Sequence, residues 1–212
     1  MKHIVFYFDP ISPFAYLAFE QLPQALEGIS YSVDYRPVLF AGLLAHWGQK
    51  GPAEIEPKRA WTFRHIHWMA QRHGIAVQTP AQHPFNPLAL LRLALASAPQ
   101  GRTPNRYVCE QVFRHVWRGA AAPNDPQRLT ALQQQLAPLR DPASDAVKQE
   151  LREATAAAVA KGVFGVPTFE VDGRMFWGFD SLDMLAAYLR GDAWFDAAHW
   201  DAASIAPPGV KR

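Results

Sequence analysis

Residues 3–16 read HIVFYFDPISPFAY, and this segment decides how the chain begins to fold. Strand-forming residues at 3–8 are followed by a short loop and then by apolar residues at helical spacing, so we predict a strand over 3–8 and a helix over 13–27. Ser12 is a favoured N-cap residue, and Pro13 is favoured at the first helical position. The start of such a helix suits an anion, to which the Ser12 hydroxyl can also donate.

A second strand-forming region lies near the other end of the chain. The segment GVPTF, residues 165–169, leads from a helical stretch into a strand. Residues 168–171 and 174–177 flank Asp172-Gly173, which is a strong hairpin-turn signal. A helix is predicted after this hairpin, over 181–190. One more strand is predicted over 29–36, where apolar and polar residues alternate until Pro37.

The region between these parts has a helical pattern, with breaks at proline and glycine. The predicted helices span 41–47, 57–73, 86–98, 104–120, 125–137 and 142–161. The order βαβ, helical block, ββα predicts an α/β fold in which helices cover both faces of a mixed sheet. We divide the chain into one domain, 1–40 with 162–212, and a helical insertion domain, 41–161. Trp194, Phe195 and Trp200 are expected to pack on the body, and the last few residues to fray.

Composition sets further limits on the class of protein. The 212 residues are 49% hydrophobic and 19% charged, which is ordinary for a globular protein, and the net charge of +2 argues neither for nor against nucleic acid. No dense tract of lysine and arginine rises above a solvated surface, and we expect neither a nucleic-acid partner nor a membrane partner. No apolar run approaches the roughly 18–20 residues of a membrane span, and no signal peptide precedes the first strand. The single cysteine, Cys109, excludes an intramolecular disulfide and favours a cytoplasmic location. The histidines lack metal-ligand spacing, so no metal site is expected.

The order of the motifs resembles a known family. A strand, Ser12-Pro13-Phe14 and a helix, with GVPTF far down the chain, resemble the thioredoxin-fold branch of DsbA-like oxidoreductases. Ser12 and Ala15 stand where the redox relatives have cysteines. The resemblance is stronger to kappa-class glutathione transferases, and strongest to 2-hydroxychromene-2-carboxylate isomerases. The motifs lie between residues 4 and 190, at 36–40, 57–59, 72–74, 84–86, 162–169 and 176–180. The resemblance implies a thioredoxin-like βαβ–ββα domain with a large all-helical insertion.

The resemblance also implies glutathione as the cofactor. Ser12 is then the catalytic residue that binds the glutathione thiol and favours its ionised form, whereas its structural alternative is a plain helix cap. A free thiol has a pKa of about 8.5, which a helix start and a hydroxyl donor can lower. The bond before Pro167 is expected to be cis, leaving the N–H and C=O of Val166 free to pair with the cofactor's backbone.

Further glutathione contacts are implied for four polar side chains. Asp180 is expected to cap the last helix and bind the γ-glutamyl end, next to Ser181, where many relatives have arginine. Lys58 is expected near the glycyl end or the substrate carboxylate. Gln49 stands where relatives have asparagine and is one methylene longer.

Lys58, Asn86 and Phe14 are the expected substrate contacts. Each has a structural alternative: Lys58 as a solvated surface residue, Asn86 as a helix N-cap, and Phe14 as part of the core.

The resemblance implies that the chain isomerises 2-hydroxychromene-2-carboxylate to trans-o-hydroxybenzylidenepyruvate, in naphthalene-type aromatic catabolism. One alternative is a kappa-like glutathione transferase or peroxidase, which shares the cofactor site. The other is a redox-inactive DsbA-like protein that binds peptides at the edge formed by Val166. A small aromatic-derived substrate and a homodimer are expected for the isomerase.

Overall fold

The computed structural model describes residues 1–205 and residue 209. The expectation that the last few residues fray falls mostly on positions outside the described residues. Its sheet has the strand order β2-β1-β3-β4. Strand β1, Lys2–Phe8, pairs in parallel with β2, Tyr31–Pro37, and antiparallel with β3, Thr168–Val171. Strand β4, Arg174–Trp177, pairs antiparallel with β3. The predicted α/β fold with a mixed sheet is confirmed.

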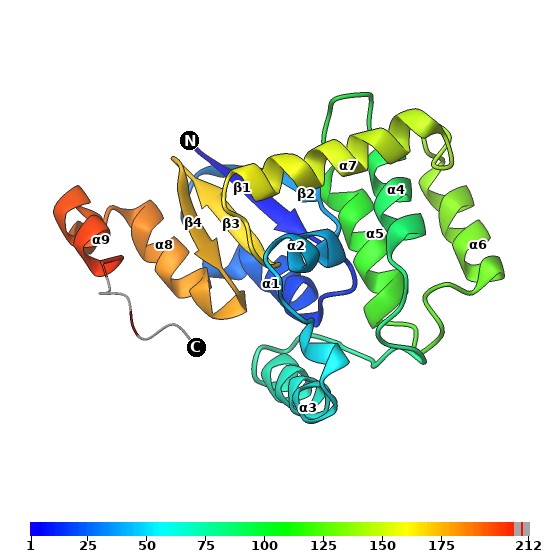
Figure 1. The fold of residues 1–212 in the computed structure, drawn as a ribbon, viewed down its shortest axis with the longest axis horizontal. Coiled ribbons are helices and arrows are strands. Elements are labelled where there is room, and N and C mark those ends of the chain that lie inside the picture. Colours follow the sequence, from blue (N-terminus) through cyan, green and yellow to red (C-terminus); the bar gives the residue numbers. More distant parts are fainter. Residues whose placement is uncertain (206–208, 210–212) are drawn as a thin grey trace.

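Strand β1 is buried on both of its faces because helices cover the sheet on each side. Ile4, Phe6 and Phe8 pack with α1, Pro13–Ala25, and α8, Leu182–Arg190. Val5 and Tyr7 point the other way, as neighbours along a strand must, and pack with α2, Phe40–His46, and the end of α7, Asp145–Ala160. Strand β1 ends in the middle of the molecule (Figure 1), and Ser12 follows it in the chain as the N-cap of α1.

The helical insertion is built mainly from four helices before α7. They are α3, Glu56–Arg72; α4, Leu88–Ala96; α5, Arg106–Trp117; and α6, Pro126–Leu136, with one short turn, η1, Pro52–Glu54. Asn105, Asp125 and Ser144 each cap the helix that follows by accepting a backbone hydrogen bond. Helices α4, α5 and α6 lie together, whereas α3 lies apart from them (Figure 1). The six predicted helices are thus confirmed, with ends that shift by up to three residues.

The chain after the sheet adds aromatic side chains to the core that packs on β1. This part of the chain contains η2, Phe179–Ser181; η3, Ala193–Phe195; and α9, Ala197–Ala203. Phe195 is buried against Phe176, and the Arg174 guanidinium lies 5.1 Å from the ring centres of both Tyr188 and Trp200. The tail therefore packs on the body, as expected, but η3 and α9 were not predicted.

Within the described ranges, no helix combines the length and apolar character needed to cross a membrane.

Candidate functional site

Ser12 links the start of α1 to the loop before β3. Its Oγ accepts a hydrogen bond from the N–H of Ala15 at 3.2 Å, so the predicted N-cap is confirmed. The same hydroxyl donates to the carbonyl oxygen of Val166, also at 3.2 Å. Pro13 has no N–H, and the N–H of Tyr16 bonds the Ser12 carbonyl, so Phe14 N–H is the first-turn donor that finds no acceptor among the residues that the structure describes. Ser12 is only 6% exposed.

The loop at Val166 has the expected cis bond before Pro167. The Pro167 carbonyl accepts from Gly178 N–H at 2.9 Å, and the Thr168 hydroxyl donates to the Gly165 carbonyl at 2.7 Å. Among the described residues, no acceptor takes the N–H of Val166. Its carbonyl, however, is engaged by Ser12, so the expectation that both groups are free is wrong for the carbonyl: the hydroxyl at the helix start is close enough to use it.

Asp9 is a buried carboxylate beside Ser12 that sequence reasoning did not single out. Oδ1 accepts from Ile11 N–H at 3.0 Å, and Oδ2 accepts from Phe40 N–H at 2.9 Å. Burial raises the pKa of Asp9 to about 7, although the two hydrogen bonds oppose the shift. The signal in the sequence was an acid inside an apolar run. Its partner Phe40 lies 31 residues further along the chain, so the hydrogen bond between them could not be predicted from sequence spacing.

The loop before Ser12 is also held by the helical insertion. Trp117 at the end of α5 donates its Nε1–H to the carbonyl of Pro10 at 2.9 Å. His83 Nε2 lies 2.9 Å from the carbonyl oxygen of Ile11, so it donates there. A second cis bond joins His83 to Pro84. The sequence analysis assigned no role to His83, and only the structure brings it to this loop.

The polar residues expected at the two ends of glutathione lie at the surface. Lys58 is the third residue of α3 and is exposed. Gln49 is exposed too, and its backbone N–H bonds the carbonyl of Leu44. No hydrogen bond or ion pair joins either side chain to Ser12 or Val166 in the described chain. Their role at the cofactor therefore stays a prediction.

Asp180 does not cap α8, contrary to the prediction. It lies inside η2, and α8 begins only at Leu182. Ser181 donates its hydroxyl to the carbonyl of Gly178 at 2.8 Å, which closes this extra turn before the helix. The Asp180 carboxylate is consequently exposed and has no hydrogen-bond partner among the described residues, which leaves it available to a ligand amine.

Asn86 and Phe14, the expected substrate contacts, lie on different elements. Asn86 is exposed and its Oδ1 accepts from Leu88 N–H at 3.1 Å, so it caps the start of α4 from one residue further out than a standard N-cap. Phe14 is partly buried, and its ring meets the ring of His65 on α3 at 5.9 Å, edge to face. Phe14 therefore contacts α3 directly through His65.

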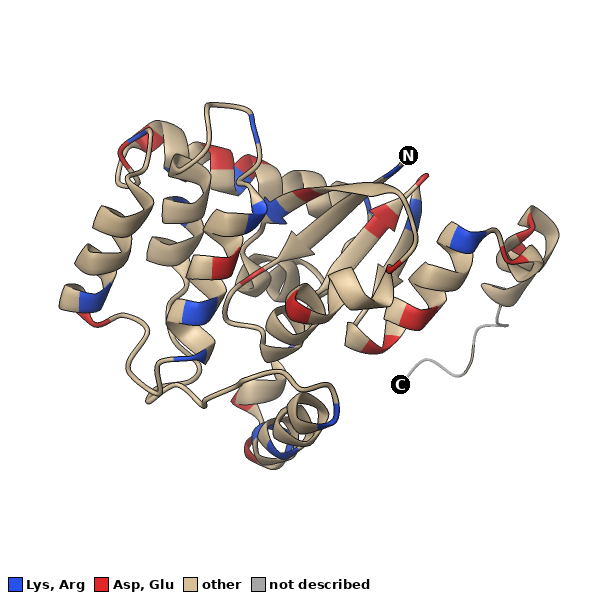
Figure 2. Cartoon of the chain, turned by 180° about the vertical axis from the view of Figure 1, so that it is seen from behind, with Lys and Arg blue, Asp and Glu red and all other residues tan. Residues whose placement is uncertain are grey.

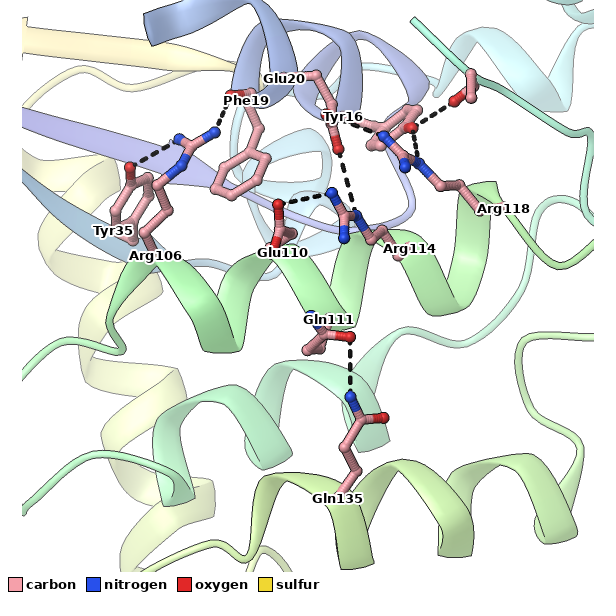
Figure 3. A network of polar contacts seen from close by, with 11 residues as sticks. Tyr16, Phe19, Glu20, Tyr35, Arg106, Glu110, Gln111, Arg114, Arg118 and Gln135 are labelled. Carbon is pink, nitrogen blue, oxygen red and sulfur yellow. Dashed lines mark hydrogen bonds and ion pairs between the residues drawn. The ribbon is translucent and has the colours of Figure 1, made fainter.

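A charged network fixes α1, which carries Ser12, against α5 (Figure 3). The Glu20 carboxylate lies 3.0 Å from Arg118 and 3.9 Å from Arg114. Arg118 Nε also donates to the hydroxyl of Tyr16 at 2.9 Å, and Tyr16 donates to the carbonyl of Ala76. Glu20 and Tyr16 both project from α1, the helix whose N-cap is Ser12. The network therefore sets where that helix start lies relative to the insertion.

Among the described residues, the structure holds no group of three or more side chains arranged to bind a metal ion. Cys109 is fully buried in α5, and burial raises the pKa of its thiol well above the usual range. The reactive sulfur of a thiol mechanism would therefore have to come from a ligand.

Residues 3–190 match the family described as DSBA-like thioredoxin domain. A 2-hydroxychromene-2-carboxylate isomerase from Pseudomonas sp. (strain C18) is 31% identical over 194 residues, which cover 88% of this chain and 89% of the relative. Glutathione S-transferase kappa 1 from Rattus norvegicus is 27% identical over 207 residues, which cover 89% and 90% of the two chains.

A solved structure of a 2-hydroxychromene-2-carboxylate isomerase has a similar fold. It superposes with a TM-score of 0.77 and 24% identity, and covers 96% of this chain and all of the other. The likeness extends through the sheet and the helical insertion.

Proposed function

Because this chain belongs to the family of DSBA-like thioredoxin domains, which spans its residues 3–190, we propose that it is a glutathione-dependent isomerase. The reaction that we assign is the interconversion of 2-hydroxychromene-2-carboxylate and trans-o-hydroxybenzylidenepyruvate, in aromatic catabolism. The relative that is 31% identical is named 2-hydroxychromene-2-carboxylate isomerase, and this name supports the assignment. The observation that carries the proposal is the pairing of the Ser12 hydroxyl with Val166 at the start of α1, where redox relatives have a cysteine.

The residues of the site fit a tripeptide thiol. The Val166 N–H is uncommitted and can pair with a peptide carbonyl, as in an added strand. The Asp180 carboxylate is exposed and can bind an amine, with Ser181 beside it. Ser12 and Phe14 N–H offer donors for a sulfur anion at a positive helix end. The Val166 carbonyl departs from this fit, because Ser12 must release it first.

Glutathione, when bound, supplies a thiolate that adds reversibly to a conjugated double bond and so lets that bond rotate. Ser12 keeps its own proton throughout: the hydroxyl turns from the Val166 carbonyl and donates to the sulfur instead. This charge-assisted hydrogen bond favours the ionised thiol. Asp9, Trp117 and His83 hold the loop that carries Ser12, so the donor is positioned before the ligand arrives. We further propose that the protein acts in the cytoplasm as a homodimer.

Replacing Ser12 by alanine tests the proposal directly. We expect the pKa of the bound glutathione thiol to rise by about one unit or more in Ser12→Ala, because a charge-assisted hydrogen bond is lost. The measurement is the ultraviolet absorbance of the thiolate as a function of pH. Ser12→Thr keeps the hydroxyl and is the matched control. Equal thiol pKa values in the wild type and in Ser12→Ala would contradict the role of Ser12.

Mass balance separates the isomerase from a kappa-like transferase or peroxidase. An isomerase converts the substrate while the amount of reduced glutathione stays constant, whereas a transferase consumes it as a conjugate and a peroxidase consumes it as the disulfide. Calorimetric titration with glutathione separates both from a peptide-binding protein, which would show no affinity for the tripeptide.

A further inference from the structure

The short helix α2, Phe40–His46, touches both of the loops that form the candidate site. One loop, 9–12, leads from β1 to Ser12, and the other, 163–167, carries Val166. Helix α2 contains no Lys, Arg, Asp or Glu, and it is therefore tan along its whole length in Figure 2. Its position is consequently fixed by hydrogen bonds and apolar contacts.

The first residue of α2 is bonded to the loop that leads to Ser12. The N–H of Phe40 donates to Oδ2 of Asp9 at 2.9 Å, and Asp9 precedes Ser12 by three residues. The residue before the helix, Leu39, donates its N–H to the hydroxyl of Thr155 in α7 at 3.0 Å. The start of α2 is thus held from two sides, by the Ser12 loop and by the last helix of the insertion.

The C-cap residue of α2, Trp47, is bonded to the other loop. Its Nε1–H donates to the carbonyl oxygen of Val163 at 3.0 Å, three residues before Val166. Val163 is 1% exposed, and no other donor of the described residues reaches its carbonyl. Loss of the indole donor would therefore leave the carbonyl of a buried residue without a protein partner, which is unfavourable.

The side chains between these two ends pack against the same loop. Leu43 is fully buried in a cluster that also contains Val163 and Val166, and Phe40 packs against this cluster. A helix of seven residues is about 10 Å long. With a hydrogen bond at each end and an apolar contact in between, α2 fixes the separation of the two loops.

The loop 163–167 depends on such support because it has no regular secondary structure. Three more of its carbonyls are engaged, at Gly165 by Thr168, at Val166 by Ser12 and at Pro167 by Gly178. Within the described chain, Trp47 makes the only hydrogen bond from the helical insertion to these carbonyls. When a ligand takes the Ser12 hydroxyl, the bond at Val166 is lost and the bond from Trp47 remains.

We propose that α2 braces the two loops against each other and that Trp47 is a positioning residue for glutathione. Acting through Val163, its indole sets where the Val166 N–H lies relative to the Ser12 hydroxyl. The inference rests on the proposed function, in which these two groups bind the backbone and the sulfur of the same tripeptide.

Trp47→Phe tests this role, because it keeps an aromatic ring and removes the N–H donor. In calorimetric titration we expect the Kd of glutathione to rise about three- to tenfold, since one hydrogen bond that positions the loop is lost. The pKa of the bound thiol should stay the same, because Ser12 and the start of α1 are untouched. A general loosening of the site would change both quantities.

Trp194→Phe is the matched control for this variant. Trp194 is 46% exposed, against 43% for Trp47, and its indole has no hydrogen-bond partner among the described residues. The Kd of glutathione should change by less than about twofold in this control, because no hydrogen bond is lost. Equal Kd values in the wild type and in Trp47→Phe would overturn the proposal.

Trp47→Gln separates the donor from the ring. The same number of bonds joins Cα to the side-chain N–H donor in glutamine and in tryptophan, so the amide can reach the Val163 carbonyl. We expect Trp47→Gln to bind glutathione more tightly than Trp47→Phe, although it lacks the ring. Circular dichroism confirms that each variant is folded. The opposite order of affinities would show that the ring is the important contact, and the role of the hydrogen bond would be wrong.

Hydrogen exchange in the free protein lets the inference and the proposed function fail separately. The N–H of Val163 bonds the carbonyl of Ala158 at 3.0 Å, so its exchange rate reports on the loop without any ligand. This rate should rise in Trp47→Phe and not in Trp194→Phe. If it does while glutathione does not bind the wild type, the brace stands and the isomerase proposal is wrong. If glutathione binds the wild type and Trp47→Phe equally well, the role of Trp47 is wrong and the proposed function stands.

Discussion

Asp9 shows how one buried side chain can hold together an entire loop. Its two oxygens accept from the N–H groups of Ile11 and Phe40, so it joins the end of β1 to the start of α2. The carboxyl is completely buried, and burial raises its pKa to about 7, from an ordinary value near 3.9. Between these two values the folded protein binds more protons than the unfolded chain. Ionisation of Asp9 therefore destabilises the fold as the pH rises through this window.

Asp9→Asn should remove this pH dependence. The asparagine does not titrate, so the free energy of unfolding of the wild type, minus that of the variant, should fall by about 2–4 kcal/mol between pH 4 and pH 8. Urea unfolding at a series of pH values measures both proteins, and other titrating groups cancel in the difference. A difference that stays constant or grows with pH would show that Asp9 is ionised at low pH.

At the scale of single residues, the sequence pointed to Ser12 at the start of α1 but not to the residues that hold its loop in place. Ser12 could be predicted because its cap, Pro13 and the first turn are neighbours in the chain. Asp9 and His83 could not, because their partners Phe40 and Ile11 lie 31 and 72 residues away. Asp180 was misplaced for a local reason: Gly178 and Ser181 form an extra turn before α8, and a helix-start pattern does not distinguish the two.

The strands and most helices could be predicted because their signals are local. The hairpin 168–177 is confirmed to the residue, since Asp172 and Gly173 both adopt the positive φ that such a turn requires. Helix ends shifted where a cap lies outside the periodic pattern, as at Asn86. The short helices η3 and α9 were missed because seven or fewer residues give too little periodicity.

The loop 163–167 fits against β4 with no room for a side chain at Gly165. A β-carbon there would lie 2.5 Å from Nε1 of Trp177, a residue that is 55% exposed and whose ring centre is 4.9 Å from that of Phe164. Gly165→Ala should therefore push the indole away and cost about 1–3 kcal/mol of stability. Trp177→Leu leaves space, and most of the loss should be recovered in the double variant. Thermal unfolding of the wild type, the two single variants and the double variant measures this recovery. Additive losses in the double-mutant cycle would contradict the steric argument.

The contact between α1 and α5 depends on a partly buried acid. Glu20 is 15% exposed and faces both Arg114 and Arg118, so Glu20→Gln leaves Arg118 without its carboxylate and leaves Arg114 with Glu110 alone. We expect a loss of about 1–3 kcal/mol, less than for a fully buried pair because the arginines are partly solvated. Glu110→Gln is the control, since Glu110 pairs with Arg114 within α5 and should matter by about 0.5 kcal/mol. Equal losses in urea unfolding would show that the bridge between the helices is not the important contact.

Across the whole molecule, the aromatic tail and the Ser12 loop lie at separate places. Phe195 is 7% exposed and packs on Phe176 and Tyr188, whereas its neighbour Trp194 is 46% exposed. Phe195→Ala should cost about 3 kcal/mol because it leaves a cavity, and Trp194→Ala less than about 1 kcal/mol. Neither should change glutathione affinity at a temperature where both are folded. A loss of affinity in Phe195→Ala without loss of stability would connect the tail to the site.

The layers of sheet and helices could be predicted from the sequence, but the packing of the insertion helices against one another could not. The order βαβ, helical block, ββα predicted helices on both faces of the sheet, and the structure places helices on each side of β1. The position of α3 apart from α4–α6 could not be predicted, because no sequence pattern states which helices pack together.

The hydrogen bond from Ser12 to Val166 has a consequence for turnover. In the resting protein the hydroxyl already has an acceptor, so an incoming ligand must offer a better one. An anionic sulfur meets this condition, and a thioether does not. Under the proposed function, alkylation of the sulfur returns the Ser12 hydroxyl to its acceptor at Val166, and the modified tripeptide loses that hydrogen bond. S-methylglutathione should accordingly be a far weaker competitor than glutathione itself, and release of an alkylated by-product should not limit the catalytic cycle.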